Sequence, residues 1–168
     1  SFYRTLAVTI LWTASNVALH LTIGLGLALL LQEGRGPMTA VYRVLLVLPW
    51  AIPNYITALT WKGLFNKEFG AVNAALGLLG VAPVDWLGST FLPAFTANLV
   101  TNTWLGFPFM MVVALGALQS IPAELYEAAR VDGAGAWARF RHVTLPMLSP
   151  YIFFNLIMGI IAPLLRKA

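Results

Sequence analysis

Cysteine is absent from this chain of 168 residues. Within the chain, that absence excludes disulfide bonds, thiolate catalysis and metal sites built on cysteine. The two histidines, His20 and His142, lie far apart, and neither has a partner at the spacing of metal ligands. We therefore expect no metal site, no cofactor and no redox chemistry in this segment.

Charged residues are also scarce, at 10% of the chain, whereas hydrophobic residues make up 60% and the mean hydropathy is +0.81. A water-soluble globular domain does not have this composition, so the sequence indicates a protein of the lipid bilayer. The net charge is +4, but the basic residues are scattered at the ends of apolar segments. Because they form no clustered stripe, we expect no binding of nucleic acid.

Four apolar segments are long enough to cross a hydrocarbon core of roughly 30 Å, which takes about 20 helical residues. They lie at about residues 6–31, 44–64, 91–118 and 148–165. Residues 71–81 are too few to span and suit a helix in the membrane interface. The sequence therefore predicts an all-α membrane protein with four transmembrane helices and no soluble domain.

Helix-breaking residues interrupt two of these segments. Pro49 and Pro53 lie in the second, and Pro93, Gly106 and Pro108 lie in the third. Each weakens the backbone hydrogen bonding of a helix where lipid offers no replacement partner. Proline and glycine are common in transmembrane helices, but several in adjacent helices favour a transporter.

The loop at residues 119–147 is polar and reads as a helix-turn-helix on the membrane surface. Ser120 is expected to cap its first helix, Gly133 to end that helix in the left-handed conformation, and residues 134–140 to form a second. Ala128 and Ala129 are small enough for another protein to approach closely, and Leu125, Tyr126 and Trp137 offer an apolar face. A loop that only rests on lipid headgroups is the alternative.

The spacing within this loop is specific. Glu127-Ala128-Ala129 is followed by three residues, Gly133, nine residues and then Val143-Thr144-Leu145-Pro146. This pattern resembles the signature EAA loop of the membrane subunits of binding-protein-dependent ABC importers, with Val143 where isoleucine is usual. The stretches at residues 41–53 (VYRVLLVLPWAIP), 61–73 (WKGLFNKEFGAVN) and 102–111 (NTWLGFPFMM) resemble the maltose/maltodextrin permeases of that family. Beyond Leu148 the chain looks more like sugar permeases in general.

The resemblance implies a helical bundle of the type I importer kind, of which residues 1–168 form a partial transmembrane domain. It also implies a second permease subunit, two ATP-binding subunits that receive cytoplasmic EAA loops, an extracytoplasmic sugar-binding protein and a multi-pass location in a bacterial or archaeal plasma membrane. The residues implied in coupling to the ATPase are Glu127, Ala128, Ala129, Asp132, Gly133, Leu145 and Pro146. Those implied in sugar binding are Asn102, Leu105, Gly106 and Phe109.

The chain itself is expected to be no enzyme and to have no catalytic residue. It lacks the G-x-x-x-x-G-K-[ST] phosphate loop, which agrees with ATP hydrolysis in a separate subunit. An intramembrane hydrolase is a poor alternative, because Ser15 and His20 are the only nearby pair and have no third group to orient them. Permeases for glycerol 3-phosphate or lactose remain alternatives, and a passive channel is a more distant one.

Polar residues inside the apolar segments are expected to hydrogen-bond between helices. This applies to Asn16 and His20 in the first segment, and to Asn54 and Asn155. Without a carboxylate in the spans, a proton relay is disfavoured. Because Ser1 is not an initiator methionine, we also expect the chain to be a fragment.

Charge does not decide the orientation. With the Glu127 loop in the cytoplasm, five basic residues lie inside and five outside. The inside set is Arg35, Arg43, Arg130, Arg139 and Arg141, and the outside set is Arg4, Lys62, Lys67, Arg166 and Lys167.

Overall fold

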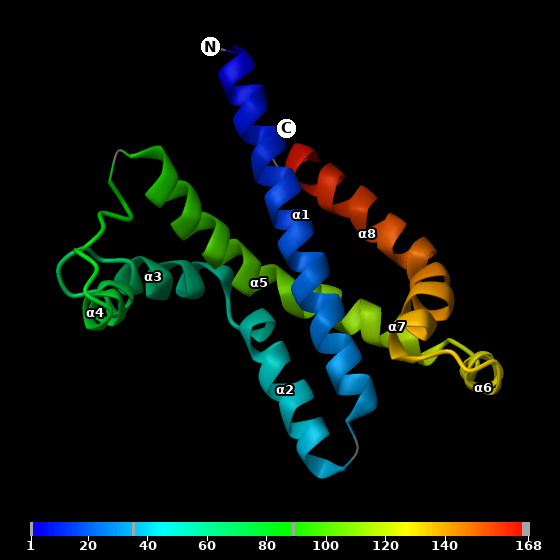
Figure 1. Cartoon of the computed structure of the whole chain (residues 1–168). Helices are drawn as coiled ribbons and strands as arrows, with labels where there is room; N and C mark the ends of the chain where they lie inside the picture. Colours follow the sequence, from blue (N-terminus) through cyan, green and yellow to red (C-terminus); the bar gives the residue numbers. More distant parts are fainter. Residues whose placement is uncertain (1, 35, 89, 166–168) are drawn as a thin grey trace.

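The computed structural model describes residues 2–34, 36–88 and 90–165, and within these ranges the chain forms helices and turns without a strand (Figure 1). The predicted all-α fold is confirmed. The helices are α1 (Phe2–Glu33), α2 (Pro37–Ala51), α3 (Asn54–Leu64), α4 (Ala71–Leu78), α5 (Phe91–Gln119), α6 (Ala123–Val131), α7 (Ala136–Arg139), the π-helical turn η1 (Phe140–Thr144) and α8 (Leu145–Leu165). Ser1, Arg35, Arg166, Lys167 and the side chain of Asn155 lie outside what the structure describes.

Helices α1 and α5 cross at the centre of the molecule, and α2 and α8 pack against this pair (Figure 1). The crossing is close because α1 has a glycine where it meets α5. A Cβ atom added at Gly24 would lie 2.6 Å from Cβ of Met110 and 2.8 Å from the backbone nitrogen of Met111. Any larger residue at Gly24 would push the two helices apart, which is the usual reason for small residues between membrane helices.

Two helices in the described residues are long and apolar enough to cross a membrane, namely Phe2–Gln32 of α1 and Phe91–Gln119 of α5. They match the first and third predicted spans. The bent pair α2 and α3 would bring the number to three. The fourth predicted span lies within α8, and the number of four spans stays a prediction.

The second predicted span, residues 44–64, is not one continuous helix. It is divided between α2, which begins earlier at Pro37, and α3, and the two meet at an angle of 94°. Ile52 is extended, with ψ 133°, because proline at the next position disfavours the helical conformation. Pro49 is accommodated inside α2, so Pro53 and not Pro49 causes the break.

The segment expected to form a short interfacial helix contains the short helix α4, whose place in the membrane interface stays a prediction. Asn73 attaches α4 to the neighbouring turns. The buried amide of Asn73 donates to the carbonyl oxygens of Lys67 and Val84, at 3.0 and 2.9 Å. Its oxygen accepts from the backbone of Val84 and from the indole of Trp86, at 3.1 and 2.9 Å. One side chain therefore satisfies the backbone of two irregular segments that meet at this end of the molecule.

The main hydrophobic core lies at the opposite end, where α1, α5 and α8 converge. Its buried members are Ala28, Leu31, Met111, Ala117, Leu118, Ile121 and Leu148. Many other large apolar side chains are exposed, among them Leu30 at 71% and Leu59 at 64%. A surface of this kind suits lipid or other membrane helices, so the protein is an integral membrane protein.

Candidate functional site

The polar loop after α5 is one of two candidate sites, and its first helix starts differently from the prediction. Ser120 does not cap α6, because its hydroxyl donates to the carbonyl of Ala117 at the end of α5, at 2.7 Å. Pro122 occupies the position before α6. Glu124 lies in the first turn and Arg130 in the last, an arrangement of charge that favours the helix dipole.

Helix α6 ends at Val131, and the left-handed Gly133 that follows, with φ 79°, terminates it as predicted. The backbone nitrogen of Ala134 donates to the carbonyl of Ala129 at 2.8 Å, and that of Gly133 donates to Arg130 at 3.0 Å. These two bonds make a Schellman motif, which satisfies carbonyls that a helix end otherwise leaves unpaired. The turn between α6 and α7 is thus fixed by backbone geometry.

Residues on the inner side of the loop anchor it to the helical core. Ile121 is buried just before α6, and Leu148 is buried in the first turns of α8. Tyr126 is half-buried, and its hydroxyl oxygen lies 2.9 Å from that of buried Thr144. The expectation that Tyr126 contributes to an exposed apolar face is therefore wrong, because its phenol is bonded to the core side of the loop.

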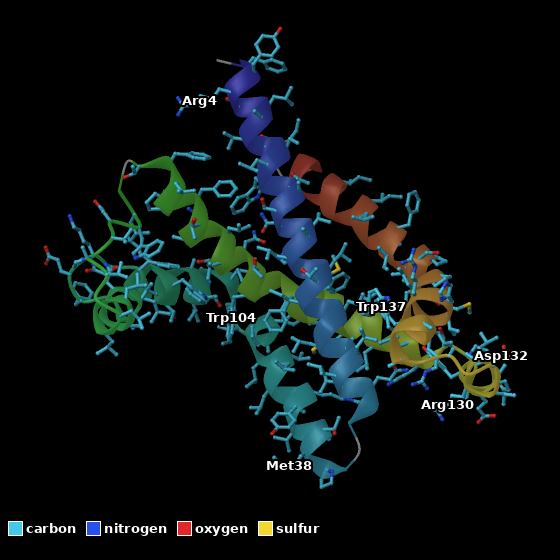
Figure 2. All side chains as sticks on the ribbon, viewed as in Figure 1. Arg4, Met38, Trp104, Arg130, Asp132 and Trp137 are labelled. Carbon is cyan, nitrogen blue, oxygen red and sulfur yellow. The ribbon has the colours of Figure 1, made fainter. Side chains whose placement is uncertain are left out.

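The outer surface of the loop carries most of the residues expected to couple to an ATPase. Figure 2 shows Arg130 and Asp132 at the tip of α6. In that part of the chain Leu125 is 41% exposed, Val131 88% and Trp137 70%. The predicted coupling residues that are exposed are Glu127, Ala128, Asp132, Gly133, Leu145 and Pro146, whereas Ala129 is half-buried.

The second half of the loop departs from the expected helix at residues 134–140. It forms the short helix α7 followed by the π turn η1, in which the nitrogen of Leu145 donates to Phe140. Pro146 explains this wider turn, because it has no N–H for the carbonyl four residues earlier and its ring crowds that carbonyl. Leu145 and Pro146 thus set the direction in which α8 leaves the loop.

The second candidate site is one face of α5. Asn102, Leu105, Gly106 and Phe109 follow the spacing of neighbours on a helix surface. Asn102, Leu105 and Gly106 are half-buried, and Phe109 is 40% exposed. The structure therefore groups the four residues predicted to bind sugar on one side of α5.

Helix α1 meets this face through His20. The Nε2 atom of His20 lies 3.1 Å from the backbone oxygen of Asn102. The imidazole also occupies the space beside Gly106, where an added Cβ would overlap it. This confirms the predicted bonding between helices for His20, whereas the amide of Asn16 donates within its own helix, to Trp12 at 2.8 Å.

Phe109 has an aromatic neighbour that sequence reasoning missed. The ring centroids of Phe109 and Trp50 are 5.9 Å apart, with their planes at 56°. Trp50 is at the end of α2, immediately before the break at Pro53. Its proximity to α5 depends on the bend between α2 and α3, and no spacing in the sequence signals that bend's direction.

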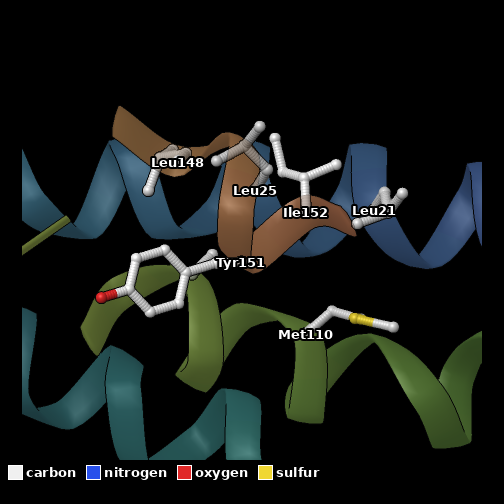
Figure 3. A pocket seen from close by; sticks show the side chains of 7 residues that line it. Leu21, Leu25, Met110, Leu148, Tyr151 and Ile152 are labelled. Carbon is white, nitrogen blue, oxygen red and sulfur yellow. The ribbon is translucent and has the colours of Figure 1, made fainter. Parts of the chain in front are cut away.

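A small pocket lies between the helices, but its chemistry does not suit a sugar (Figure 3). Apart from the hydroxyl of Tyr151, the side chains around it offer hydrocarbon and thioether groups, whereas sugar hydroxyls need hydrogen-bonding partners. The labelled residues around it are Leu21 and Leu25 from α1, Met110 from α5, and Leu148, Tyr151 and Ile152 from α8. Among the residues that the structure describes, no group of three or more histidine and carboxylate side chains is placed to hold a metal.

Comparison with known proteins identifies relatives along almost the whole chain. The family model described as "Binding-protein-dependent transport system inner membrane component" matches residues 7–165. The trehalose/maltose transport system permease protein MalF of Thermococcus litoralis is 41% identical over 94% of this chain and 52% of its own length. The galactooligosaccharides transport system permease protein GanP of Bacillus subtilis is 39% identical over 88% of this chain and 35% of its own length.

The maltose/maltodextrin transport system permease protein MalF of Vibrio parahaemolyticus is 45% identical over 83% of this chain, which spans 26% of that relative. Among solved structures, a bacterial ABC transporter involved in the import of the acidic polysaccharide alginate matches with a TM-score of 0.83 and 26% identity. The match covers 94% of this chain and 55% of that one. The chain thus spans about half, or less, of the length of these relatives.

Proposed function

Because the chain belongs to the family of binding-protein-dependent transport system inner membrane components, we propose that it forms part of the transmembrane domain of an ATP-driven sugar importer. Maltose or a maltodextrin is the proposed substrate. Two relatives named for maltose transport, at 41% and 45% identity, support this choice. The relative named for galactooligosaccharides, at 39%, keeps other oligosaccharides as the alternative.

The observation that carries the coupling part of the proposal is the way the α6–α7 loop is built. Its outer surface presents Glu127 and Ala128, while Ile121 and Tyr126 hold its inner side against the core. A force applied to such a loop moves the helices to which it is attached, instead of bending the loop. We propose that an ATPase subunit docks on this surface and that Glu127 accepts a charged hydrogen bond there.

The proposed sugar site is the α5 face of Asn102, Leu105, Gly106 and Phe109. Asparagine can donate to and accept from hydroxyls, and an aromatic ring can stack on the apolar side of a pyranose. The contact between Phe109 and Trp50 supports the proposal, since it places a second aromatic ring beside the first. Partner helices would enclose this face and complete the path.

The proposed assembly contains a second permease subunit, two ATP-binding subunits and an extracytoplasmic sugar-binding protein, in a bacterial or archaeal plasma membrane. ATP hydrolysis belongs to the separate subunits. Support comes from the family match and from an alginate transporter solved in complex with an alginate pentasaccharide-bound periplasmic protein, which matches with a TM-score of 0.81. The partner subunits would then bias the helices between two packings, and this exchange would give alternating access.

The test is sugar uptake by cells that carry the full-length gene with its neighbouring transport genes. Labelled maltose, maltotriose and glycerol 3-phosphate are compared, with and without depletion of ATP. ATP-dependent uptake of maltose is the expected result. Uptake of glycerol 3-phosphate instead would replace maltose or a maltodextrin as the proposed substrate. Uptake that continues without ATP would overturn the importer assignment in favour of a channel.

A further inference from the structure

His20 sits in a space that only a glycine leaves open. Its ring lies against Gly106, and a Cβ at Gly106 would overlap three of the ring atoms. Both residues are half-buried inside the bundle, between α1 and α5. Their contact is therefore part of the interior packing and does not depend on which partner covers the outer surface.

The same imidazole bonds to the backbone of α5. Because a carbonyl oxygen only accepts, Nε2 of His20 carries the hydrogen in its bond of 3.1 Å to Asn102. A histidine in a membrane span would be costly without such a partner. Here the partner is the main chain of a residue whose side chain belongs to the proposed sugar site.

A second contact, one turn away, fixes the same register. Gly24 of α1 faces the backbone of α5 at Met110 and Met111. Gly106 of α5 thus faces the side chain of His20, and Gly24 of α1 faces that of Met110. Each helix therefore makes room for a side chain of the other. A slip of α5 by one residue would rotate its face by about 100° and break both contacts.

The contacts of His20 and Gly24 with α5 also lie where α5 is intrinsically weak. Pro108 has no N–H for the carbonyl of Trp104, and its ring crowds that carbonyl. The contacts with Asn102 and Gly106 are just before this defect, and the contact of Gly24 with Met110 is just after it. Helix α1 therefore supports α5 on both sides of its weakest turn.

We propose that His20 is a positioning residue of the sugar site, which sets the orientation of the Asn102–Phe109 face of α5 without touching the sugar. This inference rests on the proposed function. It separates two roles on α5: the backbone of Asn102 and the bare side of Gly106 receive His20, whereas the side chains of Asn102 and Phe109 remain for the substrate.

The variants exploit the geometry of the imidazole. In His20→Gln the amide nitrogen is as many bonds from Cα as Nε2 is, so it can still donate to Asn102. In His20→Asn the amide is one bond shorter and matches Nδ1 instead. Gly106→Ala adds a Cβ atom that overlaps the imidazole ring. The double variant His20→Ala/Gly106→Ala adds the same atom but removes the ring, so the overlap disappears. Thr22→Ala is the matched control, because the exposed hydroxyl of Thr22 donates to Ala18 and Leu19 within α1.

The measurement uses the full-length permease in its complete importer, reconstituted in vesicles with its binding protein saturated by maltose or by maltotriose. Uptake, ATP hydrolysis and the ratio of maltose uptake to maltotriose uptake are recorded for each variant. We expect His20→Ala and His20→Asn to lower uptake about two- to tenfold, the value of one hydrogen bond, and to change the ratio. ATP hydrolysis should be retained, and His20→Gln should stay close to the wild type.

The decisive comparison is Gly106→Ala with and without His20→Ala. Recovery of uptake in the double variant from the level of Gly106→Ala to that of His20→Ala supports the proposal, because removing the ring makes room for the added methyl. If the double variant is no better than Gly106→Ala, or if His20→Ala behaves like Thr22→Ala, the positioning role is overturned. A loss of uptake and ATP hydrolysis together, with less assembled protein, would also overturn it in favour of a purely structural role. A wild-type importer that moves neither sugar overturns the proposed function and this inference with it.

Discussion

The hydroxyl oxygens of Tyr126 and Thr144 lie 2.9 Å apart, and this contact joins α6 to the turn from which α8 begins. It is a link between the surface of the loop and the bundle, since Thr144 is buried and Tyr126 is half-buried. A partner that pushes on α6 would therefore act on α8 through this pair. The contact makes the proposed mechanical role of the loop testable at a single atom.

Tyr126→Phe removes only the phenolic oxygen and leaves the Thr144 hydroxyl without that partner. We expect a loss of about 1 kcal/mol in the free energy of unfolding, the net value of a typical hydrogen bond. Thermal unfolding of the purified full-length importer measures it. Tyr42→Phe is the control, since Tyr42 is 52% exposed on α2. Equal melting temperatures for the two variants would contradict the anchoring role.

Glu127→Lys reverses the charge at the exposed centre of α6. If Glu127 accepts a charged hydrogen bond from an ATPase subunit, the reversal replaces attraction by repulsion and transport is abolished. The permease should still reach the membrane, because Glu127 lies outside the buried core. Uptake and membrane content are measured together, with Glu68→Lys, exposed near α4, as the control. Normal uptake in Glu127→Lys would exclude the coupling role.

Gly133→Ala tests whether the shape of the loop matters. Gly133 has a φ of 79°, where a Cβ costs about 1–2 kcal/mol, although the added atom would meet nothing within 4 Å. Gly135→Ala is the matched control, because that space is also open and its φ is −68°. We expect a lower melting temperature and weaker uptake for Gly133→Ala alone. The same effect from both substitutions would mean that backbone strain is not the cause.

Local chemistry made much of this fold predictable from sequence. The length of α5 follows from a long, mainly apolar segment without a charged residue, and the end of α6 follows from Gly133, which can take a conformation that other residues avoid. The effect of a proline was harder to judge. Pro49 and Pro53 look alike in sequence, but only Pro53 ends a helix, because tertiary packing decides which weakened turn opens.

Contacts between distant segments were beyond the sequence. The polarity of His20 predicted a bond to another helix, but nothing in the spacing pointed to Asn102 or to the open side of Gly106. Ser120 has the chemistry of a helix cap, yet its hydroxyl donates to the carbonyl of Ala117, three residues earlier at the end of α5. The partner of His20 is set by how two helices meet, which short-range patterns do not encode. The bond of Ser120 is local, and it competes with capping.

Asn102→Ala removes the amide from the proposed sugar site and leaves the backbone bond to His20 in place. A sugar hydroxyl would lose one hydrogen-bond partner, so we expect uptake to fall about fivefold, or selectivity between maltose and maltotriose to change by that factor. Asn98→Ala is the matched control, because Asn98 lies one turn earlier, is exposed, and donates to Ala94 of its own helix at 2.8 Å. Uptake assays on the full-length importer distinguish the two. If both variants carry every tested sugar at the wild-type rate, the Asn102 amide is a packing group and the site lies on another face of the bundle.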